Sequence, residues 1–350
     1  MELQGVGPEE ELGAGRPFYN TVSITEPNDG HSWDENSSVS FSFNAIIAAL
    51  YVVVCVVGLG GNALVMVAML KLDQLGTATT VYIFNLALAD GLFMVGLPFI
   101  AYQNLRSHWP FGNLTCCLVM VLDGINQFTS VFCLTAMSID RCLAAVNPLR
   151  FSQWHSPRRA KVVILLLWPL SLLPVLPMAI HISTDSGLCT PDPHAFFDSW
   201  WPFFITYAFI LGFALPFSIM IVSFVVLAVT LRSRRNNNPQ SQERQRLEGQ
   251  VTKMVAAVTL AFGVCWLPFY ATNFYVQQSP DPGPAFGRAF QFMVFLSYSW
   301  SCANPMLYAC FSEVFRKHFR TLLCRRGCWT PHIDTNTETF NLHNADSSVA

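Results

Sequence analysis

The sequence predicts an all-α membrane protein, a seven-transmembrane helix bundle with a C-terminal amphipathic surface helix. Two observations predict this fold class. Of the 350 residues, 52% are hydrophobic and only 12% are charged, whereas about a quarter of the residues of a soluble domain are charged. The hydrophobic residues form seven runs, each able to supply the roughly 20 residues of a spanning helix. These runs lie near residues 46–70, 80–103, 114–146, 160–181, 201–231, 251–277 and 286–311.

The distribution of positive charge predicts the orientation of the bundle. All but three of the 20 lysine and arginine residues fall on one side of the spans; the exceptions are Arg16, Arg106 and Arg288. Because positive residues stay on the cytoplasmic side, we expect a multi-pass plasma-membrane protein whose N-terminus is extracellular. The outer side is acidic, which favours the approach of a basic ligand.

Four segments follow from this orientation. They are an extracellular glycosylated tail (1–44), the membrane domain (45–311), a membrane-surface helix (312–324) and a disordered cytoplasmic tail (325–350). The first 40 residues are polar and do not resemble a cleavable signal peptide, so the first span should direct insertion. Asn36 and Asn113 begin glycosylation sequons, and both are expected outside.

The segment after the seventh run reads as an amphipathic helix on the inner leaflet. Phe315 and Phe319 recur at helical spacing with cations between them, and Ser312 is placed to cap the helix. Cys324 and Cys328 lie beside the inner surface, where membrane lipid is the neighbour, and are candidates for palmitoylation. The hydroxyl-rich tail offers phosphorylation sites, or serves only as a polar linker.

Three of the 11 cysteines lie on the oxidising outer side. Either Cys116 or Cys117 can pair with Cys189, which would tie the outer loop after the fourth span to the third span. The remaining thiol is then left free.

Asp123 places a carboxylate inside the third span. An ionisable residue at membrane depth is costly and marks a functional site by default. No obvious partner for Asp123 appears among the other hydrophobic runs. The natural partner is therefore a cationic ligand.

Further polar side chains recur inside the spans. Asn126 and Ser130 are four residues apart and share one helix face. Together with Asp90 and Asn304 they can supply oxygen ligands to a small, hard cation such as sodium. The alternative is a hydrogen-bonded network that holds no ion.

Two features near the inner half of the bundle suggest a conformational switch. Arg141 follows Asp140 at the inner end of the third span, and Glu248 at the start of the sixth is a second potential partner. A charge pair across this inner mouth would favour a closed state, although the charges can also be unrelated. Trp266 lies two residues before Pro268, so its ring is either a pivot at a kink or part of aromatic packing.

Several short motifs, in this order on seven spans, resemble the rhodopsin-like class of G-protein-coupled receptors. Within that class, the run from Asp123 to Thr135 is similar to the signature of the somatostatin receptors. The class motifs are Gly61-Asn62, Leu86-Ala87-Leu88-Ala89-Asp90, Asp140-Arg141, Trp168, Cys265-Trp266-Leu267-Pro268 and Asn304-Pro305-Met306-Leu307-Tyr308.

The resemblance implies a cyclic peptide hormone whose Trp-Lys turn enters the bundle. The ligand lysine would pair with Asp123 and touch Gln127. The family's disulfide spacing implies that Cys116 bonds to Cys189. The resemblance also implies coupling to inhibitory G proteins, a fall in cAMP, and arrestin binding after tail phosphorylation. Four further positions match the family's pocket: Phe269, Asn273, Phe290 and Tyr298.

Three positions depart from the pattern of the class. Cys142 stands where a tyrosine follows the arginine, and Trp300 replaces an asparagine that usually lines the sodium pocket. Phe224 replaces a tyrosine whose hydroxyl braces the inner tyrosine, here Tyr308, in the open state. These departures bear on coupling strength and sodium sensitivity, not on the fold.

Other functions fit the sequence less well. A related peptide receptor of opioid or neuropeptide B/W type would also use Asp123, but Gln127 favours the somatostatin type. An opsin needs a lysine in the seventh span, and that span has none. A transporter should show internal repeats, and an enzyme needs a water-accessible acid-base or metal constellation. We expect neither of these, and no nucleic-acid partner.

Overall fold

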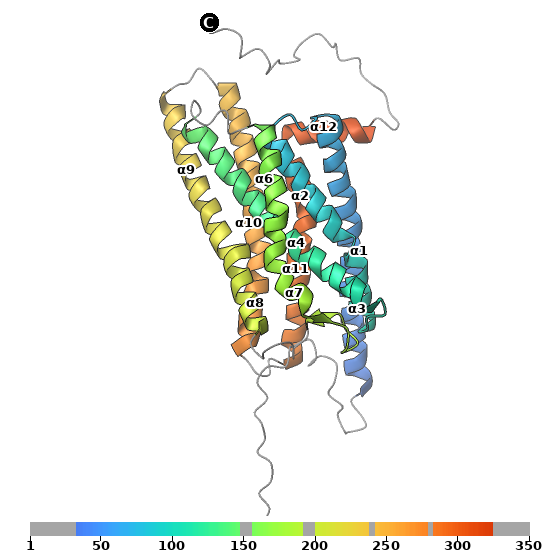
Figure 1. Ribbon diagram of the computed structural model, residues 1–350. Helices are drawn as coiled ribbons and strands as arrows, with labels where there is room; N and C mark the ends of the chain where they lie inside the picture. Colours follow the sequence, from blue (N-terminus) through green and yellow to red (C-terminus); the bar gives the residue numbers. More distant parts are fainter. Residues whose placement is uncertain (1–32, 148–155, 192–199, 238–241, 279–282, 325–350) are drawn as a thin grey trace, which may run out of the picture.

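The computed structural model describes residues 33–147, 156–191, 200–237, 242–278 and 283–324, which form an elongated helical bundle (Figure 1). The first four spans are α1 (Trp33–Lys71), α2 with α3 (Ala78–Met94, Leu97–Arg106), α4 (Gly112–Val146) and α6 with η2 and α7 (Pro157–Leu172, Leu173–Val175, Leu176–Ile180). The other elements are α8, a π-helical turn η3 and α9 (Trp200–Phe209, Ile210–Ala214, Leu215–Asn237), α10 (Gln242–Gln278), α11 (Gly283–Phe311) and α12 (Glu313–Cys324).

Six helical runs in the described part of the chain are long and hydrophobic enough to cross a membrane. The seventh, α11, has a more polar sequence, which includes Ser297, Ser301 and Asn304, and these three side chains are buried. It nevertheless packs along α1 and α10, which completes the predicted seven-helix bundle. The expectation of a helical membrane fold is thereby confirmed.

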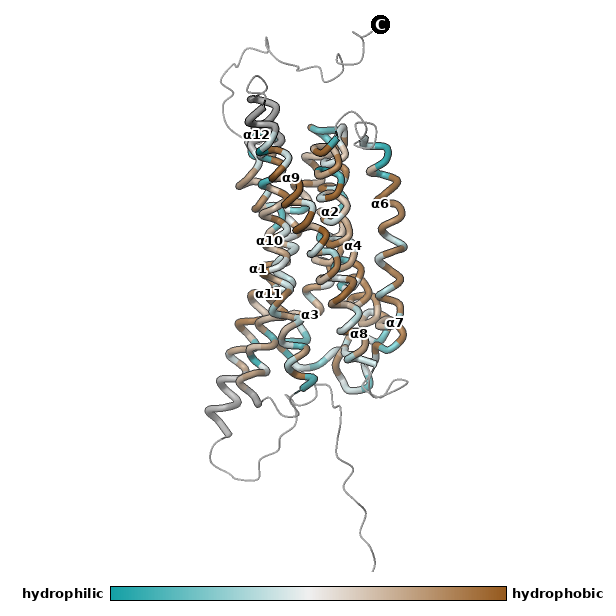
Figure 2. The backbone as a smooth tube through the Cα atoms, turned by 90° about the vertical axis from the view of Figure 1, so that its left-hand side faces the viewer, coloured by the Kyte–Doolittle hydropathy of each residue, from teal (hydrophilic) through white to brown (hydrophobic). Residues whose placement is uncertain are grey.

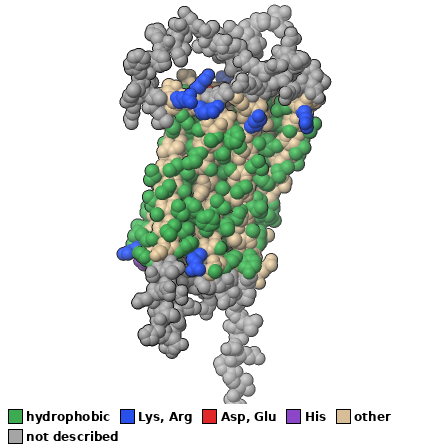
Figure 3. All heavy atoms as spheres, turned by 180° about the vertical axis from the view of Figure 1, so that it is seen from behind, with side chains coloured by type: hydrophobic (Ala, Val, Ile, Leu, Met, Phe, Trp, Pro, Cys, Tyr) green, Lys and Arg blue, Asp and Glu red, His purple; other side chains and the backbone are tan. Residues whose placement is uncertain are grey.

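The outer faces of the helices are suited to lipid. Large aliphatic side chains lie exposed along the spans, such as Leu165 at 73% and Val264 at 68%. Figure 2 shows the hydrophobic stretches along the helices, and Figure 3 shows a hydrophobic band between the lysines and arginines at the two ends. Such exposure would be costly in water, but lipid is as hydrophobic as these side chains.

The helix ends differ in part from the expected boundaries. α1 begins at Trp33, earlier than residue 45, so that Asn36 lies within the helix, and its side chain is outside the described set. Asn113 is exposed in the first turn of α4. Cys324 ends α12, although its side chain is not among those described, and Cys328 and the rest of 325–350 lie outside the described residues.

The surface helix α12 forms as predicted. The Ser312 hydroxyl accepts a hydrogen bond from the Phe315 backbone N–H at 3.5 Å, which confirms the cap. Phe315 is buried against Tyr308 at 5.3 Å between ring centroids. Arg316 and Lys317 are exposed. The helix therefore joins the bundle through one hydrophobic face and leaves its cations outside.

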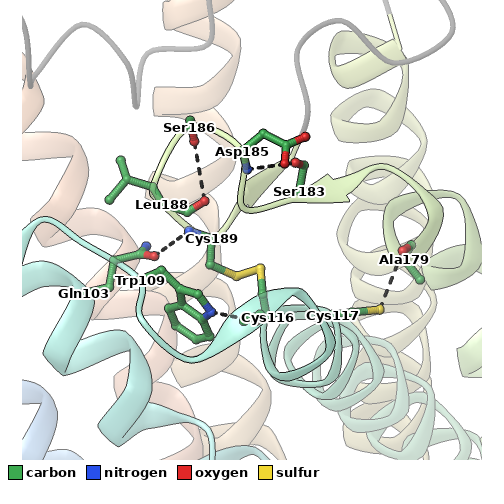
Figure 4. The surroundings of a disulfide bond; sticks show 11 residues. Gln103, Trp109, Cys116, Cys117, Ala179, Ser183, Asp185, Ser186, Leu188 and Cys189 are labelled. Atoms are coloured by element: carbon green, nitrogen blue, oxygen red, sulfur yellow. Dashed lines mark hydrogen bonds between the residues drawn. A yellow bond between two sulfur atoms is a disulfide. The ribbon is translucent and has the colours of Figure 1, made fainter.

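An outer hairpin of β1 (Ile182–Ser183) and β2 (Thr190–Pro191) is antiparallel and covers one end of the bundle. A disulfide from Cys116 to Cys189 ties this hairpin to α4 (Figure 4). Gln103 of α3 adds a second tie, because its Oε1 accepts from the Cys189 backbone N–H at 2.7 Å. The pairing implied by the resemblance is confirmed.

The neighbouring Cys117 points away from the hairpin. Its thiol donates to the Ala179 carbonyl oxygen of α7 at 3.6 Å, so it is a free thiol facing another helix (Figure 4). Consecutive helical residues project about 100° apart, which explains why only one of the two cysteines reaches Cys189.

We predict that Cys189→Ser lowers the free energy of unfolding of the purified protein by about 2–4 kcal/mol, and with it the melting temperature, because the disulfide closes a long loop. Cys117→Ser is the matched control and should leave the melting temperature unchanged. Mass spectrometry of unreduced wild-type protein should recover a peptide joined through Cys116 and Cys189. A Cys117–Cys189 peptide as the main species would refute this register.

Candidate functional site

A cavity of about 430 Å³ opens at the outer end of the bundle, beneath the hairpin. Its size lies within the range of small-molecule and peptide side-chain pockets, about 300–1,000 Å³. Side chains from α1, α3, α4, α8, α10 and α11 line it, together with Cys189 and its neighbours in the hairpin. The disulfide therefore holds the roof of this cavity in place.

Asp123 lies on the wall of this cavity, and it has a partner that the sequence did not reveal. The Tyr298 hydroxyl of α11 donates to Asp123 Oδ2 at 2.9 Å. The sequence does not reveal this partner, because a tyrosine hydroxyl is neutral and gives no charge signal within a hydrophobic run. The hydroxyl orients the carboxylate but carries no positive charge, so it does not neutralise a negative charge on Asp123.

Aromatic packing explains why Tyr298 points at Asp123. Its ring lies 5.0 Å from that of Phe93 on α2, edge to face, and 5.8 Å from that of Tyr51 on α1. Such contacts leave a large ring little rotational freedom. Three spans thereby position the hydroxyl that orients Asp123.

Five of the six predicted ligand residues line the cavity: Asp123, Gln127, Phe269, Phe290 and Tyr298. Asn273 is the exception, since the described residues that line the cavity do not include it. Its Nδ2 donates to the Phe269 carbonyl oxygen of its own helix at 2.8 Å, and the side chain is buried. A contact between Asn273 and a ligand therefore stays a prediction.

Sequence reasoning missed part of the cavity wall. Tyr270 hydrogen-bonds both to the Gln127 side chain and to the Ala208 carbonyl oxygen. Trp201 and Phe204 of α8 form a stacked pair at 5.4 Å that also lines the cavity. Tyr270 lies four residues after Trp266, so helical spacing alone could have placed it on the inner face.

The predicted polar cluster assembles deeper in the bundle. Asn304 Nδ2 donates to Asp90 Oδ2 at 2.7 Å, and the Ser130 hydroxyl donates to Asn126 Oδ1 at 3.3 Å. Asn126 Nδ2 in turn donates to the Ser301 hydroxyl at 3.0 Å. All of these side chains are buried, and the structure brings the four predicted residues into one region.

Among the described residues, two acceptor oxygens of this cluster find no hydrogen-bond partner. They are Asp90 Oδ1 and Asn304 Oδ1, and both are fully buried. A buried acceptor without a partner is costly and calls for a donor, a water or an ion. Carboxylate and amide oxygens are the ligands that hard cations prefer, so the donor set fits sodium.

A chain of packed aromatic rings extends from the cavity wall into the bundle. Trp266 packs against Phe269 of the cavity wall at 5.7 Å and against Phe262 at 6.0 Å. Phe262 then meets Trp300 edge to face at 5.4 Å. Trp300 thus packs on Phe262 of α10, and the hydrogen bond from Asn304 to Asp90 forms in the presence of this indole.

The comparison with known proteins agrees with this architecture. The profile of the 7 transmembrane receptor (rhodopsin family) matches residues 61–308. The chain is 45% identical to mouse somatostatin receptor type 2 over 93% of this chain and 84% of that protein. It is 42% identical to bovine type 5 (88% and 85% covered) and 45% identical to human type 3 (80% and 68% covered).

The chain belongs to the somatostatin receptors of the rhodopsin family. This is a family of receptors and not of enzymes, as the sequence indicated. Its members span the plasma membrane several times, which agrees with the helices of the described chain.

The inner mouth of this receptor carries the charges that were expected to act as a switch. Asp140 and Arg141 are partly buried at the end of α4, where both act electrostatically on Tyr82 of α2. Glu248 belongs to α10, but its side chain lies outside the described set. A pair between Arg141 and Glu248 therefore stays a prediction.

A loop at the inner end joins α1 to α2 beside α12. Gln74 and Leu75 adopt left-handed backbone angles, with φ of 49° and 53°, which few residues other than glycine adopt without cost. Leu75 packs on the core and holds the turn.

The same loop brings Asp73 close to α12. Partial burial raises the pKa of Asp73 above its usual range, and the charge of His318 on α12 opposes that shift.

The Tyr308 hydroxyl is buried near this end and has no hydrogen-bond partner in the part of the chain that the structure describes. Phe224 of α9 is partly buried against the core and offers no hydroxyl. A tyrosine there could share a hydrogen bond with Tyr308 when the inner mouth opens. That Phe224 weakens the open state by lacking this hydroxyl stays a prediction.

We predict that Phe224→Tyr raises basal and agonist-driven signalling several-fold at equal surface expression. One hydrogen bond contributes about 0.5–1.5 kcal/mol net, and populations follow the free-energy difference between states. The same substitution in a Tyr308→Phe background should have little effect. Unchanged or lower signalling would mean that Phe224 is only a packing variant.

Proposed function

We propose that this receptor binds a somatostatin-like cyclic peptide outside the cell and activates inhibitory G proteins inside it, which lowers cAMP. The observation that carries the proposal is the Asp123 carboxylate on the cavity wall, hydrogen-bonded to a neutral hydroxyl. The relatives named somatostatin receptors, at 42–45% identity over most of the chain, support the choice of peptide.

The ligand's basic side chain is proposed to reach Asp123 from the outer opening. Asp123 accepts one hydrogen bond from Tyr298 and, as a carboxylate, has further lone pairs for an ammonium group. A charge pair formed away from water is stronger than one at a surface. Aromatic side chains of the ligand would meet Phe269, Phe290, Trp201 and Phe204, which line the same cavity.

The effect of ligand binding is proposed to reach the inner mouth through this chain of packed aromatic rings. Phe269 and Tyr270 line the cavity, and both pack on Trp266. Trp266 lies two residues before Pro268, where α10 lacks a backbone donor. A ligand that displaces these rings would rotate the part of α10 that controls the inner mouth, a known type of helix movement.

The surroundings of the receptor follow from the same orientation. We propose that the N-terminus is extracellular and glycosylated at Asn36 or Asn113, and that Cys324 and Cys328 carry palmitate in the inner leaflet. Phosphorylation of the hydroxyl-rich tail would add the negative charge that arrestin requires.

We also propose that the polar cluster holds sodium in the closed state. Asp90, Asn126, Ser130 and Asn304 would hold the ion, which neutralises the buried carboxylate when bound. Support comes from the orphan oxygens of Asp90 and Asn304. An ion that prefers the closed state lowers agonist affinity, because a ligand shifts an equilibrium by its differential affinity.

Asp90→Asn should remove this effect of sodium. In wild-type membranes, agonist affinity should fall several-fold when N-methylglucamine chloride is replaced by sodium chloride at constant ionic strength. In Asp90→Asn membranes the two salts should give the same affinity. An equal sodium effect in both proteins would show that the cluster is a hydrogen-bonded network without an ion.

Asp123→Asn tests the proposed function directly. It keeps the shape of the side chain and removes the charge, and loss of one partner of a buried charged pair costs about 2–5 kcal/mol. Peptide affinity should fall by a factor of roughly 30 or more, with a matching loss of cAMP suppression in transfected cells. Asp185→Asn, an outer acidic residue with an exposed side chain, is the matched control. Unchanged peptide binding by well-expressed Asp123→Asn would contradict the proposal, as would preference for an opioid peptide in the wild type.

A further inference from the structure

The Tyr270 hydroxyl links three spans beneath the cavity. It lies within hydrogen-bond reach of Gln127 Nε2 on α4 and of the Ala208 carbonyl oxygen on α8, 3.1 Å away. Tyr270 itself comes from α10 and is 1% exposed. The three groups form one short chain of hydrogen bonds at the cavity wall.

The backbone carbonyl of Ala208 decides which groups donate and which accept in this series of hydrogen bonds. A carbonyl oxygen only accepts, so the single proton of the Tyr270 hydroxyl goes to Ala208. The hydroxyl oxygen must then accept from Gln127, and the amide nitrogen must be the atom that faces it.

The amide oxygen of Gln127 is consequently the end left for the cavity that Gln127 lines. Gln127 follows Asp123 by one helical turn, and residues four apart lie about 5–6 Å from one another on one face. The third span therefore presents a carboxylate and an amide oxygen side by side. An ammonium group has three N–H donors and can satisfy both acceptors together with a third.

A glycine makes this arrangement possible. Gly212 lies in the π-helical turn η3, and a Cβ atom there would be 3.2 Å from the Tyr270 hydroxyl and 3.1 Å from the Phe128 ring. The same Cβ would lie 3.5 Å from Gln127 Nε2. The missing side chain thus provides the space in which Tyr270 and Gln127 meet.

We propose that Tyr270 is a positioning residue that orients the Gln127 amide, so that its oxygen joins Asp123 in selecting a primary ammonium group over a quaternary one. This inference rests on the proposed peptide-binding function and adds a specificity to the same site. A quaternary ammonium group keeps the charge that Asp123 attracts but has no N–H to give to Gln127.

The test compares two somatostatin-like peptides that differ only in the basic residue, lysine in one and trimethyl-lysine in the other. Their affinities are measured by competition on wild type, Tyr270→Phe, Gln127→Ala and the double variant, at matched surface expression. The readout is the ratio of the two affinities, which a uniform loss of packing does not change. Tyr207→Phe is the control, because that hydroxyl donates to the Pro174 carbonyl oxygen and does not line the cavity.

We expect the wild type to favour the lysine peptide, and Tyr270→Phe to reduce that preference by about three- to tenfold, the value of one oriented hydrogen bond. Gln127→Ala should reduce it equally, and the double variant should show no further reduction. Tyr207→Phe should retain the full preference. A full preference in Tyr270→Phe, or a second reduction of equal size in the double variant, would overturn the inference.

A second variant reaches the same contact without altering Tyr270. Gly212→Ala should also reduce the lysine preference, because the new methyl group separates Tyr270 from Gln127, whereas Gly60→Ala has free space and should not. An unchanged preference in Gly212→Ala would count against the inference. If wild type binds neither peptide, the proposed function itself fails. If wild type prefers lysine and both variants keep that preference, only the role of Tyr270 fails.

Discussion

The arrangement of the outer half of the bundle depends on one carboxylate, Asp123, that is held on the wall of an open cavity inside a hydrophobic bundle. A buried charge without a partner is among the most expensive features of a protein, and in a membrane the cost rises further. Here the cost is reduced by the Tyr298 hydroxyl and by the opening toward the outer side. The rings of Phe93 and Tyr51 hold that hydroxyl, so α1, α2 and α11 are all engaged in orienting one side chain of α4. The Tyr298 hydroxyl is neutral, so a negative charge on Asp123 has no positive counterpart in this contact, and we propose that a cationic ligand provides one.

The third span contributes side chains both to the outer cavity and to the deeper polar cluster. Asp123 and Gln127 face the cavity, whereas Asn126 and Ser130 belong to the deeper cluster with Asp90. The two levels are separated by hydrophobic and aromatic packing rather than by a continuous chain of hydrogen bonds. Phe269, Trp266, Phe262 and Trp300 form a continuous chain of packed rings below the cavity, and we propose that this chain carries the effect of a ligand toward the inner mouth. Packed rings have discrete arrangements, which suits a two-state response more than a gradual one.

Much of this was predictable from the sequence, because membrane spans and intramembrane polar residues leave strong signals. The seven runs, the cap at Ser312 and the grouping of Asp90 with Asn304 follow from length, spacing and cost. The contact between Asp123 and Tyr298 was not predictable, since it depends on how two helices distant in sequence rotate about their axes. The hydrogen bond from the Asn273 amide to the Phe269 carbonyl oxygen of its own helix was likewise not predictable from the sequence. Helical spacing could place Tyr270 on the inner face, but its contact with Gln127 was not predictable because it depends on the space that Gly212 leaves.

The most direct measurement of the central claim is a double-mutant cycle between the receptor carboxylate and the ligand cation. Affinities are determined for wild type and Asp123→Asn, each with a somatostatin-like peptide carrying lysine and with the same peptide carrying norleucine, a neutral side chain of similar shape. The account predicts a coupling free energy of about 2 kcal/mol or more, since each single change would already remove the charge pair. A coupling near zero, with losses that simply add, would contradict it and would mean that Asp123 serves the bundle and not the ligand.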